Sequence, residues 1–144
     1  MRVLVLAMMV LCMAGPASAE TEIALVCYIT CEKSTHSNPE YKACLARAAD
    51  KADRLLNKSY KALRTAVRDG AKATGQKPDT ELQALTGAQN AWIVYRDANC
   101  TFEDELAFGG TAIGGNYSAC LCVLSYQRVD DFDRMRKRML FNGD

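Results

Sequence analysis

The fold class of this chain is predicted by residues 38–70, which read NPEYKACLARAADKADRLLNKSYKALRTAVRDG. Its first residues, Asn38, Pro39 and Glu40, are types favoured as N-cap, first helical residue and first-turn acid. Apolar or small residues then recur at steps of three and four, which keeps them on one face of a helix. These residues are Tyr41, Cys44, Leu45, Ala48, Ala52, Leu55, Leu56, Tyr60, Leu63 and Val67. The sequence therefore predicts one long helix that ends at Gly70.

A second helix is predicted from Thr80 to about Leu106, after a loop from Gly70 to Asp79 that has turn composition. Thr80 and Gln83 have the spacing of a capping box, in which each side chain satisfies a free backbone N–H group. One face carries Leu82, Leu85, Ala88, Trp92, Tyr95 and Asn99. Trp92 is the single Trp of the chain and is expected to anchor the core.

A glycine-rich loop and a third helix complete the predicted bundle. Phe108 to Asn116 has four glycines in nine residues, a density that regular helices do not tolerate well. A third helix is expected to begin near Tyr117 and to end in a basic run, Arg134 to Arg138, that suits a helix C-terminus. Its apolar face carries Cys120, Val123, Leu124, Phe132, Met135 and Met139, with Gln127 among them. The prediction is an all-α fold, a three-helix antiparallel bundle with a disulfide-pinned N-terminal arm.

The first residues have the pattern of an export signal. Arg2 precedes an apolar run that ends in Ala17-Ser18-Ala19, a small-residue cleavage site, so residues 1–19 are predicted to be a cleaved signal peptide. Residues 20–37 show no sustained helical period and are interpreted as an arm, and residues 38–144 as the helical domain. Cys12 raises the alternative of a lipoprotein, but it lies inside the apolar run after Val10-Leu11. A periplasmic or secreted protein is expected, without membrane insertion after cleavage.

Composition and cysteine count narrow the function further. The 144 residues carry a formal net charge of +1, which does not indicate a basic surface for binding nucleic acid. Six cysteines remain after signal removal, an even number that favours three disulfides in an exported chain, with 15 connectivities open. A four-thiolate zinc site made by Cys27, Cys31, Cys120 and Cys122 is the alternative, although one residue between Cys120 and Cys122 is tighter than zinc sites use.

Candidate catalytic residues are few, and no cofactor is expected. The single imidazole, His36, lies in a polar segment and is interpreted as a surface residue. The acidic runs Glu103-Asp104-Glu105 and Asp130-Asp131-Asp133 lack calcium-loop spacing and are interpreted as solvated helix faces, so no metal site is predicted. Polar residues at fixed helical positions are expected to hydrogen-bond across helices, with Arg96 or Arg128 as alternative anion ligands. These residues are Asp53, Asn57, Gln89, Arg96, Asp97 and Arg128.

Several motifs together resemble the LprI-type domain, a family of small exported bacterial proteins named after a mycobacterial lysozyme inhibitor. They are Cys44 with Ala52-Asp53-x-x-Leu56-Asn57-x-x-Tyr60-x-x-Leu63, then Gln89-x-Ala91-Trp92-Ile93-x-Tyr95-Arg96-Asp97-Ala98-x-Cys100, Gly109-Gly110-Thr111, and Cys120-x-x-x-Leu124-Ser125-x-x-Arg128. The resemblance covers about residues 31–132. It implies disulfides Cys31–Cys44 and Cys100–Cys120, which leaves Cys27 and Cys122 as an additional pair.

The resemblance also implies a function, inhibition of a lysozyme-like glycoside hydrolase by a protein that is not an enzyme. Gly109, Gly110, Thr111 and Asn116 are the expected contact, because a rigid loop can offer backbone N–H groups and a hydroxyl to a partner's cleft. A bulky residue at Gly110 or Asp at Thr111 is expected to abolish inhibition with little change in melting temperature. The alternative is a structural or accessory envelope protein that binds another protein or a small ligand.

Overall fold

The computed structural model describes residues 22, 23 and 25–141, with the side chains of residues 140 and 141 excepted. Within them every regular element is helical: η1 (Leu25–Ile29), α2 (Thr30–Ser34), α3 (Asn38–Ala73), α4 (Asp79–Glu105) and α5 (Gly115–Phe141). The predicted signal peptide, residues 1–19, lies outside the described residues. The all-α prediction is confirmed.

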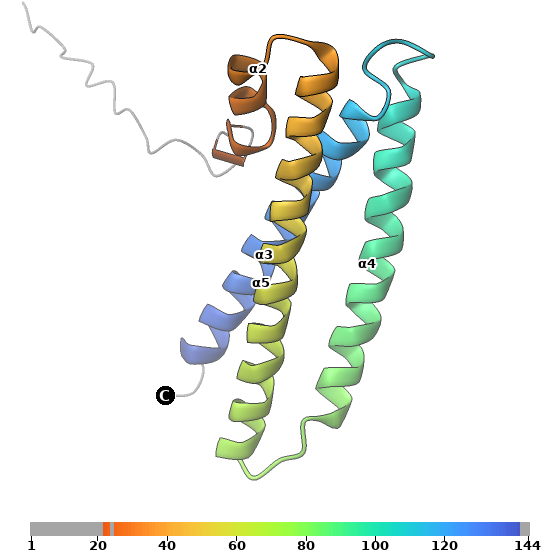
Figure 1. The fold of residues 1–144 in the computed structure, drawn as a ribbon. Helices are drawn as coiled ribbons and strands as arrows, with labels where there is room; N and C mark the ends of the chain where they lie inside the picture. Colours follow the sequence, from red (N-terminus) through yellow and green to blue (C-terminus); the bar gives the residue numbers. More distant parts are fainter. Residues whose placement is uncertain (1–21, 24, 142–144) are drawn as a thin grey trace, which may run out of the picture.

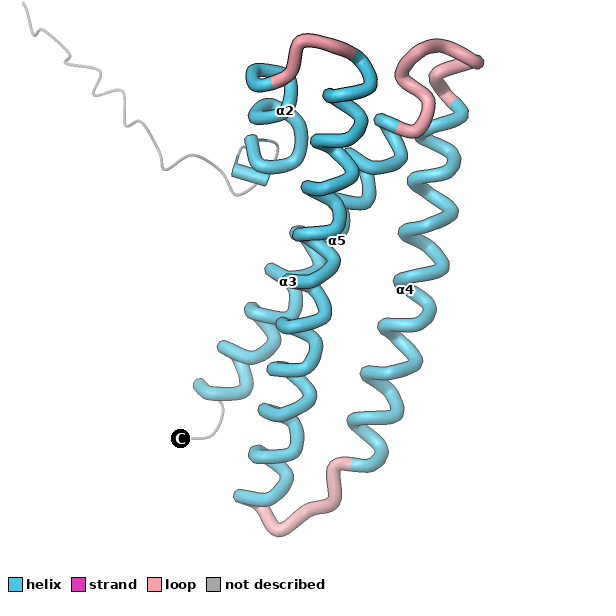
Figure 2. Tube along the Cα trace, viewed as in Figure 1, coloured by secondary structure: helices cyan, strands magenta, loops and turns pink. Residues whose placement is uncertain are grey.

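The three long helices run in alternating directions, and α5 crosses α3 obliquely (Figure 1). Loops are confined to the two ends of the bundle (Figure 2). The prediction of three helices with a non-helical arm is wrong, because η1 and α2 form a helical segment beside the start of α3. Ile23, Cys27 and Cys31 are each four residues apart and all buried, so helical turns bring them to one side, against the bundle. That segment is too short for a periodic pattern to identify it.

The core lies between α3 and α5. Leu45, Ala49, Ala52, Leu56, Ser59 and Leu63 of α3 are buried at steps of three and four. One buried cluster joins Leu56 and Leu63 to Phe132 of α5, and a second joins Ile23 and Cys27 to Ala49, Ala52 and Cys122. The predicted core face of the first long helix is thus largely confirmed, apart from Leu55, which is exposed.

The helix α4 is much less buried than its sequence predicted. It packs mainly on α5 and buries only Gln89 and Cys100 among its residues. Tyr95 is 56% exposed and Ala88 is also exposed, so their predicted core positions are wrong. Trp92 is half-buried against the Phe132 cluster rather than enclosed by it. A helix that contacts mainly one neighbour can bury only a narrow stripe, and this leaves the wider apolar face of α4 in solvent.

Helix boundaries differ from their predictions by a few residues. Ser37, not Asn38, is the N-cap of α3, with its hydroxyl accepting from the backbone N–H of Glu40 at 3.4 Å. The helix passes through Gly70, because one glycine costs only about 1 kcal/mol inside a helix, and ends at Ala73 before Gly75, which has φ 69°.

The starts of α4 and α5 also differ. The predicted Thr80–Gln83 capping box is wrong, since α4 begins at Asp79 and has no side-chain cap. The last long helix begins at Gly115, two residues before the predicted Tyr117.

Candidate functional site

The glycine-rich loop joins α4 to α5 at the end of the bundle that also carries α2 (Figures 1 and 2). Beside it lies a polar pocket of about 470 Å³, here called the loop pocket. Its walls come from α2, the segment between α2 and α3, the start of α3, the loop and the start of α5: Glu32, Thr35, His36, Ser37, Asn38, Tyr41, Lys42, Thr111, Ala112, Gly115 and Asn116. Two of the four predicted contact residues, Thr111 and Asn116, line this pocket, and Gly109 and Gly110 do not.

Three disulfides surround this end of the molecule. They join Cys27 to Cys122, Cys31 to Cys44 and Cys100 to Cys120, the pairing that the family resemblance implies. The last bond links the end of α4 to the start of α5 across 20 residues and so ties the two ends of the loop together. Such a bond restricts the unfolded loop and is worth about 3 kcal/mol in the chain-entropy model.

Asp104 fixes the far end of the loop. Its carboxylate accepts the backbone N–H of Gly114 at 2.7 and 2.9 Å and that of Tyr117 at 3.0 Å. The interpretation of this acid as part of a solvated run is therefore wrong: it satisfies free N–H groups at the start of α5, where a negative charge is also favoured by the helix dipole. Asn38 adds a third tie, because its amide donates to the carbonyl of Thr111 at 3.0 Å.

The loop backbone is tightly constrained at its glycines. Gly109 and Gly114 both have φ 79°, a conformation that glycine adopts without strain. A Cβ atom at Gly110 would lie 2.9 Å from the carbonyl oxygen of Ala107. The expectation that a bulky residue at Gly110 leaves stability unchanged is therefore wrong, and Thr111, which is exposed, is the cleaner position for testing contact.

Phe108 is a residue of this loop that sequence reasoning did not single out. It is 90% exposed and has φ 47°, which a bulky side chain rarely adopts. The sequence placed it only in a turn, directly before Gly109 and Gly110.

Glu40 organises the rim of the loop pocket. Its carboxylate accepts the backbone N–H of His36 at 3.1 Å, while Ser37 caps the same helix end. The hydrogen bond from His36 and then that from Ser37 hold the pKa of Glu40 below its usual value of 4.5. His36 itself is exposed, as its sequence context predicted.

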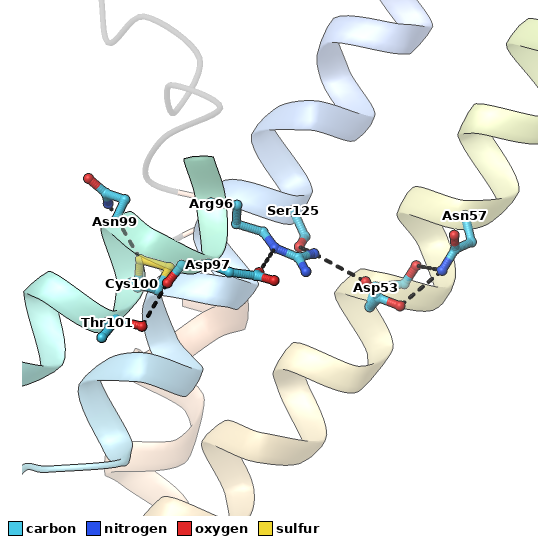
Figure 3. A network of polar contacts seen from close by, with 9 residues as sticks. Asp53, Asn57, Arg96, Asp97, Asn99, Cys100, Thr101 and Ser125 are labelled. Atoms are coloured by element: carbon cyan, nitrogen blue, oxygen red, sulfur yellow. Dashed lines mark hydrogen bonds and ion pairs between the residues drawn. A yellow bond between two sulfur atoms is a disulfide. The ribbon is translucent and has the colours of Figure 1, made fainter. Parts of the chain in front are cut away.

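Figure 3 shows a polar network on the three long helices, formed by residues of the family motifs that do not line the loop pocket: Asp53, Asn57, Arg96, Asp97 and Ser125. Arg96 of α4 reaches Asp53 of α3 at 3.2 Å, Asp97 at 2.9 Å and the Ser125 hydroxyl of α5 at 3.4 Å. Asn57 donates to the carboxylate of Asp53 at 2.9 Å. One guanidinium thus connects all three long helices, which confirms the predicted role of Arg96 and Asp53 in hydrogen bonds across helices.

A second guanidinium completes this structural network. Arg128 of α5 donates to the Gln89 amide oxygen of α4 at 3.2 Å. Arg96 and Arg128 lie 5.3 and 5.5 Å from the ring centroid of Trp92, within cation–π range. The Arg128 guanidinium also lies 4.7 Å from the ring of Phe132. The guanidinium groups of Arg96 and Arg128 thus bind residues of the fold itself, which favours the structural interpretation over that of anion ligands.

The described residues contain no group of three His, Cys, Asp or Glu side chains placed to hold a metal ion. Over the same residues, no helix has the length and apolar character needed to cross a membrane. The loop and the pocket beside it present hydroxyl and amide groups, through Thr111 and Asn116, on a backbone that Asp104 and Asn38 restrain.

These features define a disulfide-stabilised helical protein with a rigid, donor-rich loop, and comparison with known proteins identifies its family. The profile of the family Lysozyme inhibitor LprI matches residues 31–132, so the chain belongs to that family. The chain is 29% identical over 130 residues to the uncharacterized protein R02472 of Rhizobium meliloti (strain 1021), with 88% of this chain and 89% of the relative covered. No solved structure matches significantly. Membership of an inhibitor family and three disulfides both indicate an extracytoplasmic protein.

Proposed function

We propose that this protein is an exported, non-enzymatic inhibitor that blocks the cleft of a muramidase, a lysozyme-like glycoside hydrolase. The family supplies the partner class, since its printed description is lysozyme inhibitor. The signal-like residues 1–19 support release into the periplasm or the medium. Binding needs no catalytic residue of its own, because occupation of the cleft excludes the saccharide.

The loop Gly109 to Asn116 is the proposed contact, through Gly109, Gly110, Thr111 and Asn116. The observation that carries this assignment is the restraint of the loop by Asp104 at one end and by the Cys100–Cys120 bond at its base. A loop that is already ordered loses little conformational entropy when it docks. The cleft of a glycoside hydrolase holds two carboxyl groups, and these complement N–H and O–H donors.

Affinity in this proposal comes from local contacts. The 18 basic and 17 acidic side chains nearly cancel, so the protein as a whole does not strongly attract a charged partner over long distances. Inhibition should therefore depend weakly on ionic strength compared with that of a strongly acidic inhibitor.

The test is the rate of lysis of a peptidoglycan suspension by several lysozyme classes, with and without the purified mature protein. Slower lysis by at least one class at micromolar inhibitor is expected. Thr111→Asp should abolish the effect, because a negative charge would face the cleft carboxylates. Thr80→Asp is the matched control, since Thr80 is an exposed residue at the opposite end of α4.

The competing function is a structural or accessory envelope protein that binds another protein or a small ligand. The loop pocket favours it, because a volume of about 470 Å³ lies in the range of small-molecule sites. Failure to inhibit every lysozyme tested would replace the inhibitor proposal by this one. Inhibition that is equal for wild type and Thr111→Asp would leave the function standing and reassign the contact surface. The next residues to test would be Lys72, in the last turn of α3, and Lys77, in the segment between α3 and α4.

A further inference from the structure

We propose that Phe108 is the anchor of the docked loop, inserting its ring into the saccharide cleft of the partner hydrolase. This inference rests on the proposed function and names one residue of the contact whose loss should weaken binding strongly. Phe108 lies outside the four positions expected from the sequence, which are glycines and polar residues.

The first observation is that Phe108 contributes nothing to the core. Its side chain is 90% exposed, the highest value among the large apolar residues exposed in the described part of the chain. Its backbone has φ 47°, where Gly or Asn fits far better than Phe. A bulky residue held in a strained and exposed conformation points to a role in contact rather than in folding.

The second observation concerns the surroundings of the ring. From Leu106 to Asn116 no side chain is charged, so the whole segment can leave water without burying an ion. Aromatic residues, Phe among them, are enriched at the desolvated core of protein interfaces.

The third observation concerns backbone N–H groups of the loop that could donate to the carboxyl groups of the partner's cleft. Within the part of the chain that the structure describes, the backbone N–H groups of Gly109, Thr111 and Ala112 have no acceptor. They flank Phe108 on its C-terminal side, on a loop that Asp104 and Asn38 restrain. An apolar ring next to three free N–H donors complements a cleft that combines sugar-binding walls with two carboxyl groups.

The test compares Phe108→Ala and Phe108→Gly with Phe102→Ala, using calorimetric binding to a lysozyme that the wild type inhibits. Phe102 is a matched control, because it is 62% exposed on α4 and lies outside the loop. Both Phe108 variants should bind about 30-fold more weakly, which corresponds to about 2 kcal/mol, and Phe102→Ala should bind like wild type. Phe108→Gly should melt at or above the wild-type temperature, since glycine adopts the same φ without strain.

A competition experiment locates the ring. Oligomers of N-acetylglucosamine, which occupy a lysozyme cleft, should displace the wild-type protein from the enzyme. Wild-type affinity in the Phe108 variants, or an equal loss in Phe102→Ala, would overturn this inference while the inhibitor function stands. Binding that the saccharide leaves unchanged would overturn both this inference and the proposed occupation of the cleft. A wild-type protein that neither binds nor inhibits any lysozyme would overturn the proposed function and this inference with it.

Discussion

Asp104 accepts the backbone N–H of Gly114 with both carboxylate oxygens, at 2.7 and 2.9 Å, and so closes the loop between α4 and α5. The same carboxylate accepts from Tyr117 inside the first turn of α5. One side chain therefore determines both where the loop ends and where the last helix begins.

Replacement of Asp104 should loosen the loop without unfolding the bundle. Asp104→Ala is expected to lower the free energy of unfolding by about 1 to 2 kcal/mol, the usual cost of losing a helix cap. Amide hydrogen exchange should accelerate at Gly114 and Tyr117. Glu105→Gln, one residue further along the same acidic run, should leave both measurements near wild type, and an equal effect would show that charge rather than the hydrogen bonds matters.

Two glycine-to-alanine substitutions should change the free energy of unfolding in opposite directions. Gly110→Ala places a Cβ atom 2.9 Å from the Ala107 carbonyl and should destabilise the protein by about 1 to 3 kcal/mol. Gly87→Ala, in the exposed face of α4 with open space around it, should stabilise by up to about 1 kcal/mol because alanine favours the helix. Chemical denaturation gives the free energy of unfolding of both variants. A Gly110→Ala protein as stable as the wild type would contradict the loop geometry.

Trp92→Ala should lower the free energy of unfolding by about 3 kcal/mol, the lower end of the range for large aromatic deletions, because the ring is only half-buried. The loss includes its contacts with the guanidinium groups of Arg96 and Arg128. Trp92→Phe should lower the free energy of unfolding by less than half as much as Trp92→Ala does. An unfolding midpoint at the wild-type value for Trp92→Ala would contradict this packing.

Glu40 should make the protein less stable in acid. Its pKa is lowered in the fold by the hydrogen bonds from His36 and Ser37, so its contribution is fully present above the unfolded value of 4.5 and is lost as the pH falls through the folded value. Glu40→Gln should melt below wild type at pH 7, and the difference should vanish below the folded pKa. Glu81→Gln removes a first-turn acid of α4 instead, and should change the melting temperature less at pH 7.

The exported protein should contain three disulfides and no free thiol. Cys12 lies in the predicted signal peptide, and the other six cysteines are paired. Intact mass spectrometry should find no alkylated cysteine before reduction and six after it. Alkylation of the unreduced protein, or bound zinc, would contradict the pairing.

The periodic patterns in the sequence predict the three long helices of the bundle. The spacing of Leu45, Ala52, Leu56 and Leu63 specifies which face of α3 is buried, because a helix converts steps of three and four into one stripe. The family motifs, extending through Arg128, identified the family and implied the cysteine pairing. The helices and their buried faces are properties of local periodicity and residue type, which need no knowledge of the neighbouring element, whereas the cysteine pairing was implied by the family resemblance.

What covers each helix face depends on how the helices pack. Tyr95 shares a stripe with Trp92 in the sequence, but α4 packs mainly on α5 and leaves Tyr95 in solvent. The helical turns around Cys27 are held against the bundle by its disulfide to Cys122, 95 residues away. The bonds from Asp104 to Gly114, the clash at Gly110 and the exposure of Phe108 likewise depend on the path of the loop. Periodicity reports which residues share a face, whereas burial and hydrogen bonding depend on partners that folding brings from distant parts of the chain.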